Sequence, residues 1–258
     1  MKKLFYFFLI LVAVSCSQEK AKNGAVIYSF DDQYIDQWYN HRELFNQYDI
    51  KATFFIHRPN LLDSSAIVML KQLQADGHEI AFHGTNHRNV LDFKDSVDVL
   101  LEKEMVPGID CLRNQGFEVQ SYAYPFGQSN PPIDSMLLYV FRYLRKATYN
   151  MHNTTIDQYD EIYVSSPSQR IMNSMGIDNN YGISLENFEK GLLRAQKNNE
   201  VLVLHAHRID TTFSDYTVNS RYLENTFQLC KKHNIPAIRV ADLESFFQDT
   251  KRTIFSKH

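Results

Sequence analysis

Short apolar segments alternate with amphipathic ones along most of the chain, and this alternation predicts an α/β protein. Buried strands are expected at residues 25–30, 51–56, 78–82, 119–124, 201–204 and 237–240. Between them, apolar positions recur at helical spacing, most clearly over 64–75, 184–197 and 221–233. Strands that alternate with helices favour a mostly parallel sheet, so we expect a single α/β domain closed, or nearly closed, into a barrel.

The pattern is harder to read beyond residue 127. Residues 136–145 look helical, whereas 146–182 are polar and show no clear period. Earlier in the chain a helix is expected over 96–112, where Pro107 should end or bend it because proline lacks the N–H that a helix interior needs.

The first residues have the pattern of a secretory leader. A cationic start is followed by an apolar run over 4–14, which is shorter than the ~20 residues of a membrane-spanning helix. Small residues then precede Cys16, and a polar stretch follows. This arrangement resembles a bacterial lipoprotein lipobox, which implies that Cys16 is lipidated and becomes the mature N-terminus. Ordinary secretion with cleavage nearby is the alternative.

We therefore divide the chain into a lipoprotein signal peptide at 1–16, a polar tether at 17–24 and a folded domain at 25–250. The expected location is the cell envelope, on the outer membrane or the periplasmic face, and secretion is the alternative. About 240 residues remain after the leader, a length that α/β barrels occupy as one domain. The formal net charge of −3 argues against a nucleic-acid partner.

Polar side chains repeatedly follow the expected strands. In parallel α/β sheets, sites form at the carboxyl ends of the strands, so segments that are distant in sequence should converge there. The segments in question are Asp31-Asp32, His83 to His87, Pro125-Phe126-Gly127 and His205-Ala206-His207.

Two of these segments offer a ligand set for a metal ion. Asp32, His83 and His87 supply one carboxylate and two imidazoles, which suit a borderline divalent ion such as Zn²⁺, while Co²⁺, Ni²⁺ or Mn²⁺ could support the same geometry. Three protein ligands leave a coordination position open for water, the mark of a catalytic metal. Asp31 lies next to the first ligand and is free to act as a base.

The same segments resemble the polysaccharide deacetylase family, the NodB homology domain of carbohydrate esterase family 4. The family's Thr-Phe-Asp-Asp-Gly motif corresponds to Ser29-Phe30-Asp31-Asp32-Gln33. Its Gly-His-Glu-Ile motif, followed by a histidine pair, corresponds to the run from Gly77 to His87. The resemblance covers roughly residues 25–248. It implies a distorted, incomplete (β/α) barrel and metal-dependent removal of acetyl groups from glycans.

The resemblance also implies roles for these residues. Asp32, His83 and His87 would hold the metal, Asp31 would act as general base, and the backbone N–H of Phe126 would stabilise the oxyanion. A late histidine would protonate the leaving group. His205 is slightly favoured because it directly follows the apolar run, but His207 lies on the same strand face and stays open.

Substrate contacts are expected from the end of a strand and from one tryptophan. Tyr124, Pro125 and Phe126 follow the strand at 119–124 and would line the mouth of the site. Trp38 could stack on a sugar ring, with core packing as the equal alternative.

Three departures from the family pattern stand out. Gln33 replaces the usual glycine, which would alter the turn there. Ala123 replaces the arginine that pairs with the catalytic aspartate in many members, so Asp31 should be held less firmly. The family's tryptophan-bearing fourth motif is absent; Asp178 could be its remnant carboxylate, but a solvated loop residue is the favoured interpretation.

These observations favour an exported polysaccharide deacetylase that acts on N-acetyl or O-acetyl groups, since both chemistries need the same metal ligands. The alternative is a metal-binding or glycan-binding lipoprotein with the same fold and no turnover. The sequence selects neither the glycan nor the oligomeric state.

Overall fold

A computed structural model describes residues 24–148 and 155–255. The predicted signal peptide, its Cys16 and residues 17–23 of the tether lie outside this part. Within the described residues, no helix has the length and apolar character needed to cross a membrane.

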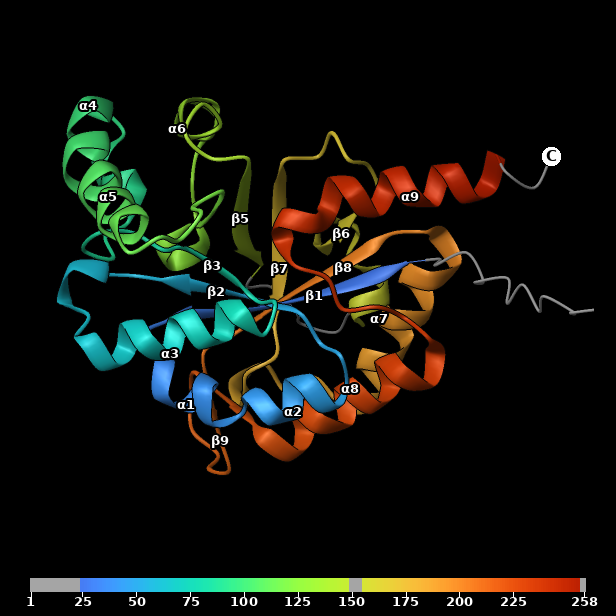
Figure 1. Ribbon diagram of the computed structural model, residues 1–258. Helices are drawn as coiled ribbons and strands as arrows, with labels where there is room; N and C mark the ends of the chain where they lie inside the picture. The colour runs from blue at the N-terminus through green and yellow to red at the C-terminus, as the bar shows by residue number, and fades with distance from the viewer. Residues whose placement is uncertain (1–23, 149–154, 256–258) are drawn as a thin grey trace, which may run out of the picture.

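A ring of parallel strands forms the centre of the molecule (Figure 1). β8 pairs with β1 from Ala25↔Val201 to Phe30↔Ala206, and this pairing closes the ring. The barrel is distorted, because β3 and β4 share the single register pair Phe82↔Tyr122. The ring strands are β1 Ala25–Asp32, β2 Ala52–Ile56, β3 Glu79–Phe82, β4 Ser121–Ala123, β5 Tyr143–Thr148, β7 Ile171–Gly176 and β8 Val201–Ala206.

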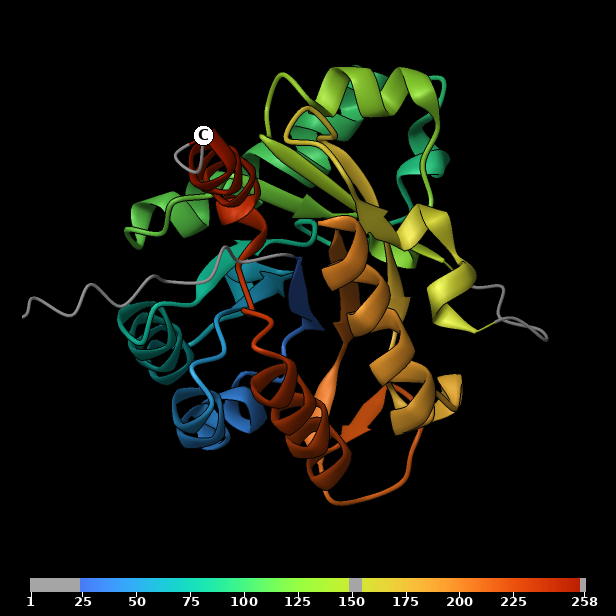
Figure 2. The same cartoon turned by 90° about the vertical axis from the view of Figure 1, so that its right-hand side faces the viewer.

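Helices cover the outside of the barrel, as the two views show (Figures 1 and 2). They are α1 Ile35–Asn40, α2 Arg42–Gln47, α3 Ser64–Ala75, α4 Val97–Leu100, α5 Val106–Asn114, α6 Pro131–Leu137, α7 Leu185–Asn198, α8 Ser220–His233 and α9 Leu243–Phe255. The short strand β6 (Tyr163–Val164) pairs antiparallel with β8. β9 (Arg208–Asp210) and β10 (Thr217–Asn219) form a separate parallel pair. The predicted α/β barrel is confirmed.

Alternation along β1 separates two parts of the core and leads to the site. Val26, Tyr28 and Phe30 pack beneath the helices, in a cluster that contains many aromatic rings. Ala25 and Ile27 belong to a second cluster inside the barrel. Because side chains alternate along a strand, Asp31 continues this inward row. The side chains of β1 that point into the barrel are therefore apolar at the start of the strand and end in the carboxylate of Asp31.

The C-terminal segment closes the other end of the barrel. Leu243 and Phe246 of α9 join the interior cluster. The backbone N–H of Val240 donates to Thr53 Oγ1, and that of Ala241 donates to Glu79 Oε2, near the first residues of β2 and β3. The carboxyl ends of the strands are left as the face on which a site can form.

Most predicted elements agree with the structure. α3 has the predicted bounds, and α7 begins after Ser184, whose Oγ accepts a hydrogen bond from the Asn187 N–H. The predicted helix over 96–112 is broken by a π-helix at Leu101–Met105, and Pro107 lies in the first turn of α5.

Two predicted elements are wrong. The helix expected over 136–145 is instead the end of α6 followed by β5. The strand expected over 237–240 makes only one bridge, Val26↔Ala237. The sequence pattern did not predict β5 and β7, because polar residues such as Arg145 and Ser174 interrupt their apolar pattern.

Candidate active site

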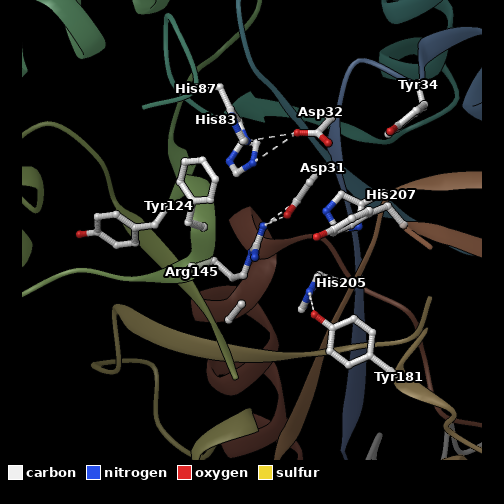
Figure 3. Close-up of a pocket in the computed structure, with 14 residues that line it drawn as sticks. Asp31, Asp32, Tyr34, His83, His87, Tyr124, Arg145, Tyr181, His205 and His207 are labelled. Carbon is white, nitrogen blue, oxygen red and sulfur yellow. Dashed lines mark hydrogen bonds and ion pairs between the residues drawn. The ribbon is translucent and has the colours of Figure 1, made fainter. Parts of the chain in front are cut away.

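The segments singled out by sequence meet in a cavity of about 250 Å³ at the carboxyl ends of the barrel strands (Figure 3). Asp31 and Asp32 come from β1, His83 and His87 from the segment after β3, and His205 from the end of β8. The remaining lining residues are Tyr34, Tyr124, Phe126, Gly127, Arg145, Ala147, Tyr181, His207 and Tyr216.

Three of these side chains have the spacing of metal ligands. Asp32 Oδ1 lies 3.7 Å from His83 Nε2 and 3.4 Å from His87 Nε2. One ligand atom from each of the three residues lies within 4.8 Å of the others. Tetrahedral bonds of about 2.0–2.1 Å would put ligand atoms about 3.3 Å apart, so this group could close around one ion with small shifts.

The backbone at these ligands is strained. Asp32 has φ = 86° and His87 has φ = 57°, both in the left-handed region that side chains other than glycine rarely adopt. Gly84, between the two histidines, has φ = 95°, where a glycine is required. Strain of this kind costs about 1–3 kcal/mol per residue and concentrates at functional sites.

The protonation of the two histidines also suits a metal. Burial lowers the pKa of His83 to about 3 and lowers that of His87, so both imidazoles are neutral at pH 7. His83 Nδ1 lies 2.8 Å from the carbonyl oxygen of Ala123, to which it donates its proton. Its Nε2 lone pair then faces Asp32, as ligation requires.

Asp32 completes the fit to a cation. Burial raises its pKa, and the charge of neighbouring Asp31 adds to this effect. Among the described residues, no lysine or arginine forms an ion pair with Asp32. A divalent ion at this position would supply the missing positive charge.

Asp31 forms an ion pair with Arg145 of β5 inside the barrel. Arg145 Nη2 lies 2.5 Å from both Asp31 carboxylate oxygens, and the two residues are 1% and 3% exposed. Burial alone would raise the pKa of Asp31, but the Arg145 charge, helped by nearby histidines, outweighs it and holds the pKa well below its usual range. Asp31 is therefore ionised at neutral pH.

The expectation that Asp31 is held loosely, drawn from Ala123, is wrong. Ala123 on β4 is the register partner of Arg145 on β5. The two positions lie side by side on the ring, so the cation absent at residue 123 is supplied from the adjacent strand. The sequence signal for Arg145 was a single arginine in a segment that had been interpreted as helix.

The two late histidines have different surroundings. His207 Nδ1 lies 2.6 Å from Asp178 Oδ2, and Asp178 Oδ1 accepts from the His207 backbone N–H at 3.1 Å. Asp178 is 1% exposed, so its interpretation as a solvated loop residue is wrong. Burial lowers the pKa of His207, but hydrogen bonding and charge from Asp178 outweigh this and raise it overall.

His205, slightly favoured from sequence, is enclosed by neutral partners. Its Nδ1 lies 2.9 Å from Ser174 Oγ and its Nε2 lies 3.3 Å from the hydroxyl of Tyr181. Burial lowers its pKa well below the usual value. Of the two late histidines, His207 is therefore the one whose pKa is raised by its surroundings.

The aromatic residues divide between the cavity and the core. Phe126, in the turn Pro125–Gly127, has φ = 61° and is 52% exposed, with its ring 5.1 Å from that of His87. Tyr124 is buried, and its hydroxyl donates to Asp134 Oδ1 at 2.7 Å. Trp38 is completely buried and donates from Nε1 to the His207 carbonyl oxygen, so of its two alternatives the structure favours core packing over stacking on a sugar. The aromatic residues that line the cavity are Tyr34, Tyr124, Phe126, Tyr181 and Tyr216.

The fold and site define a (β/α)-barrel protein in which Asp32, His83 and His87 could hold a metal ion beside the buried Asp31–Arg145 ion pair. Residues 18–151, just over half of the chain, match the family model described as polysaccharide deacetylase. The chain therefore belongs to the polysaccharide deacetylase family, as its sequence motifs predicted.

The curated protein "Putative polysaccharide deacetylase YheN" of Bacillus subtilis (strain 168) is 30% identical over 119 residues, 46% of this chain and 39% of that protein. The chain thus matches about two fifths of that relative's length.

Solved structures share the fold. The peptidoglycan deacetylase PdaC from Bacillus subtilis aligns with a TM-score of 0.56 at 12% identity, covering 92% of this chain and 98% of that one. The Xyl-CE4 domain of a multidomain xylanase from the hindgut metagenome of Trinervitermes trinervoides aligns with a TM-score of 0.55 at 18% identity, covering 86% and 89%. A mutant of BA3943, a family pseudoenzyme with restored activity, aligns with a TM-score of 0.57 at 11% identity, covering 87% and 69%.

The Asp31–Arg145 pair leads to a prediction about stability. Arg145→Met should lower the unfolding free energy by about 3–5 kcal/mol at pH 7, because it leaves the buried Asp31 carboxylate without a compensating cation. The folded pKa of Asp31 is depressed, so the pair's contribution is present above the unfolded value of about 3.9 and is lost as pH falls through the folded pKa. Urea unfolding at pH 7 and pH 3 should therefore show the deficit shrinking in acid.

Two further variants control this experiment. Arg142→Met removes a half-exposed arginine just before β5 and should cost less than about 1 kcal/mol. The double variant Ala123→Arg/Arg145→Ala returns a cation from the adjacent strand and should recover part of the lost stability. An equal cost at positions 142 and 145 would contradict the importance of the buried pair.

The Asp178–His207 contact leads to a second prediction. Asp178→Asn should lower the pKa of His207, because the carboxylate is what stabilises the imidazolium. NMR titration of the His207 ring measures this directly. Asp210→Asn, an exposed change just beyond His207, is the matched control and should leave the titration unchanged. The interpretation fails if His207 titrates identically in wild type and Asp178→Asn.

Proposed function

We propose that this protein is a metal-dependent hydrolase that removes acetyl groups from a polysaccharide or oligosaccharide. The observation that carries the proposal is that Asp31, ion-paired with Arg145, and His207, hydrogen-bonded to Asp178, line one cavity with the Asp32, His83 and His87 group. A base and an acid are thus available at one metal site, with pKa values moved apart by their surroundings.

The donor set fits a divalent ion, and zinc suits it best, with Co²⁺, Ni²⁺ or Mn²⁺ as alternatives. Asp32, His83 and His87 would hold the ion, which when bound would polarise the acetyl carbonyl and acidify water.

The protein's own residues would carry out the remaining chemistry. Asp31, kept ionised by Arg145, accepts the proton of the attacking water. The backbone N–H of Phe126 donates to the carbonyl oxygen as negative charge develops on it. His207, whose pKa is raised by Asp178, gives a proton to the departing amine or alkoxide.

A glycan substrate agrees with the shape and composition of the cavity. Tyr34, Phe126 and Tyr216 contribute aromatic faces and edges at its lining, and such rings pack well against the apolar faces of sugars. PdaC is named a peptidoglycan deacetylase, and the domain from the Trinervitermes trinervoides hindgut metagenome belongs to a multidomain xylanase. We infer an acetylated glycan here, with N-acetyl and O-acetyl substrates to be compared directly.

The competing function is metal or glycan binding without turnover. The family includes at least one pseudoenzyme, BA3943, so the fold does not guarantee catalysis. The intact pairs Asp31–Arg145 and His207–Asp178 favour turnover, because a protein that only binds has no need for a buried base and a buried acid.

The decisive measurement is acetate release from N-acetylated and O-acetylated oligosaccharides by the full chain loaded with Zn²⁺ or Co²⁺. Asp32→Ala should lose both metal binding and activity. Asp31→Asn should keep the metal yet lose about 10²–10⁴-fold in kcat, the usual contribution of a general base. A protein that binds metal but releases no acetate from any substrate would favour the binding function.

We also propose that the protein is exported and anchored through a lipid on Cys16, on the evidence of its cationic start, short apolar run and small residues before Cys16. Expressed in a bacterium, the wild type should partition into detergent and show a lipidated Cys16 by mass spectrometry of the N-terminal peptide. Cys16→Ser should remain unlipidated. A mature N-terminus elsewhere, with no lipid on the wild type, would contradict the anchor.

A further inference from the structure

A third histidine faces the candidate metal centre. His57 directly follows β2, and its side chain is 14% exposed. Its Nε2 lies 3.7 Å from Asp32 Oδ1, the same distance as that of His83 Nε2. Its ring centroid lies 4.9 Å from that of His87. Three imidazoles therefore surround one carboxylate oxygen, and the roles given above use only two of them.

The surroundings of His57 argue against a fourth metal ligand. The set whose ligand atoms all lie within 4.8 Å of one another contains Asp32, His83 and His87, without His57. His57 Nδ1 is buried and has no hydrogen-bond partner among the described residues. A proton on that nitrogen would bury an N–H without an acceptor, at a cost of about 1–3 kcal/mol.

The tautomer follows from this comparison. His83 places its proton on Nδ1, where the Ala123 carbonyl accepts it, and leaves Nε2 free for a metal. His57 has no such acceptor, so its proton belongs on Nε2, which faces Asp32. An Nε2 that carries a proton has no lone pair for a metal, but it can donate a hydrogen bond.

Asp32 lacks a donor of this kind. Among the described residues, no hydrogen bond is made to its carboxylate, and the Nε2 atoms of the three histidines lie 3.4–3.7 Å from its Oδ1. Carboxylates that bind metals are usually hydrogen-bonded themselves, and the bond fixes their orientation. The 3.7 Å separation from His57 exceeds a hydrogen bond, and a shift of roughly 0.8 Å would form one.

Gln33 holds His57 close enough for that shift. Its side-chain Nε2 donates to the carbonyl oxygens of His57 at 2.6 Å and Arg58 at 3.0 Å. Gln33 is also the residue next to Asp32 in the chain, so it ties the end of β1 to the end of β2. A glycine, which the family usually has here, could not make this connection.

We propose that His57 is a positioning residue of the metal centre, which donates its Nε2–H to the Asp32 carboxylate when the centre holds a divalent ion, with Gln33 fixing its backbone. The inference rests on the metal site of the proposed function, but not on deacetylation. The consequence is tighter metal binding, since the carboxylate would be held in the orientation that ligation requires.

The test measures Zn²⁺ affinity of the full chain by competition with a chelator, and the visible absorption of the Co²⁺ form. His57→Leu and His57→Asn should weaken Zn²⁺ binding about 10–100-fold, as the loss of a ligand's hydrogen-bond partner does. His57→Gln, whose amide N–H can reach the place of Nε2–H, should stay within about threefold of wild type. All three should keep the Co²⁺ spectrum, because no ligand is lost.

A double-mutant cycle tests the role of Gln33. Gln33→Ala should weaken Zn²⁺ binding, and combining it with His57→Leu should add little, because both remove the same interaction. His233→Gln, on α8 and bonded to Glu189, is the matched histidine control and should bind Zn²⁺ like wild type. Circular dichroism of the metal-free variants checks that each has folded.

Three outcomes would overturn the proposal. Wild-type affinity in His57→Leu would show that His57 does not act on the centre. Loss of affinity in all three variants together with a changed Co²⁺ spectrum would make His57 a ligand. A wild type that binds neither ion would remove the metal site, and the proposed function with it. If the wild type binds metal but releases no acetate, only the proposed function fails, because the affinities of the His57 variants still decide the inference.

Discussion

The buried ion pair between Asp31 and Arg145 is the constraint around which the site is organised. Taking a carboxylate out of water is costly unless a cation and good geometry compensate, and one Arg145 nitrogen contacts both oxygens of Asp31. The ring of Phe55, 5.2 Å from the guanidinium carbon, lies against the same group. The pair links β1 to β5 across the barrel interior and allows an ionised carboxylate to lie beside the candidate metal ligands.

Burial then assigns different protonation states to chemically similar groups. His83 and His205 are both buried and remain neutral, the first donating to a backbone carbonyl and the second enclosed by hydroxyl groups. The pKa of His207 is raised because the buried carboxylate of Asp178 is hydrogen-bonded to its ring. One cavity can thus contain imidazoles and carboxylates with different pKa values, because each has a different partner.

Much of the site could be predicted because its residues are close together in sequence. Asp31 and Asp32 end one strand, and His83 and His87 follow another, so apolar runs and short motifs were enough to identify them. Arg145 and Asp178 could not be identified in this way. Each acts on a residue more than twenty positions away. Arg145 ends a segment whose pattern looked helical, and Asp178 lies in the polar stretch 146–182. The sequence left Trp38 equally open to sugar stacking and core packing, because a tryptophan near a motif looks the same in sequence whether it faces the cavity or, as here, the core.

The sequence by itself determined the alternation of strands and helices, the family, and the side chains that end β1 and follow β3 and β8. These are local properties, since strand periodicity and motif spacing depend on neighbours along the chain. Only the tertiary structure decided which cation reaches Asp31, which late histidine contacts a buried carboxylate and that His57 faces Asp32. Those outcomes depend on strand register and on what a buried group touches. Register places Arg145 beside Ala123, and no pattern within either strand records that pairing.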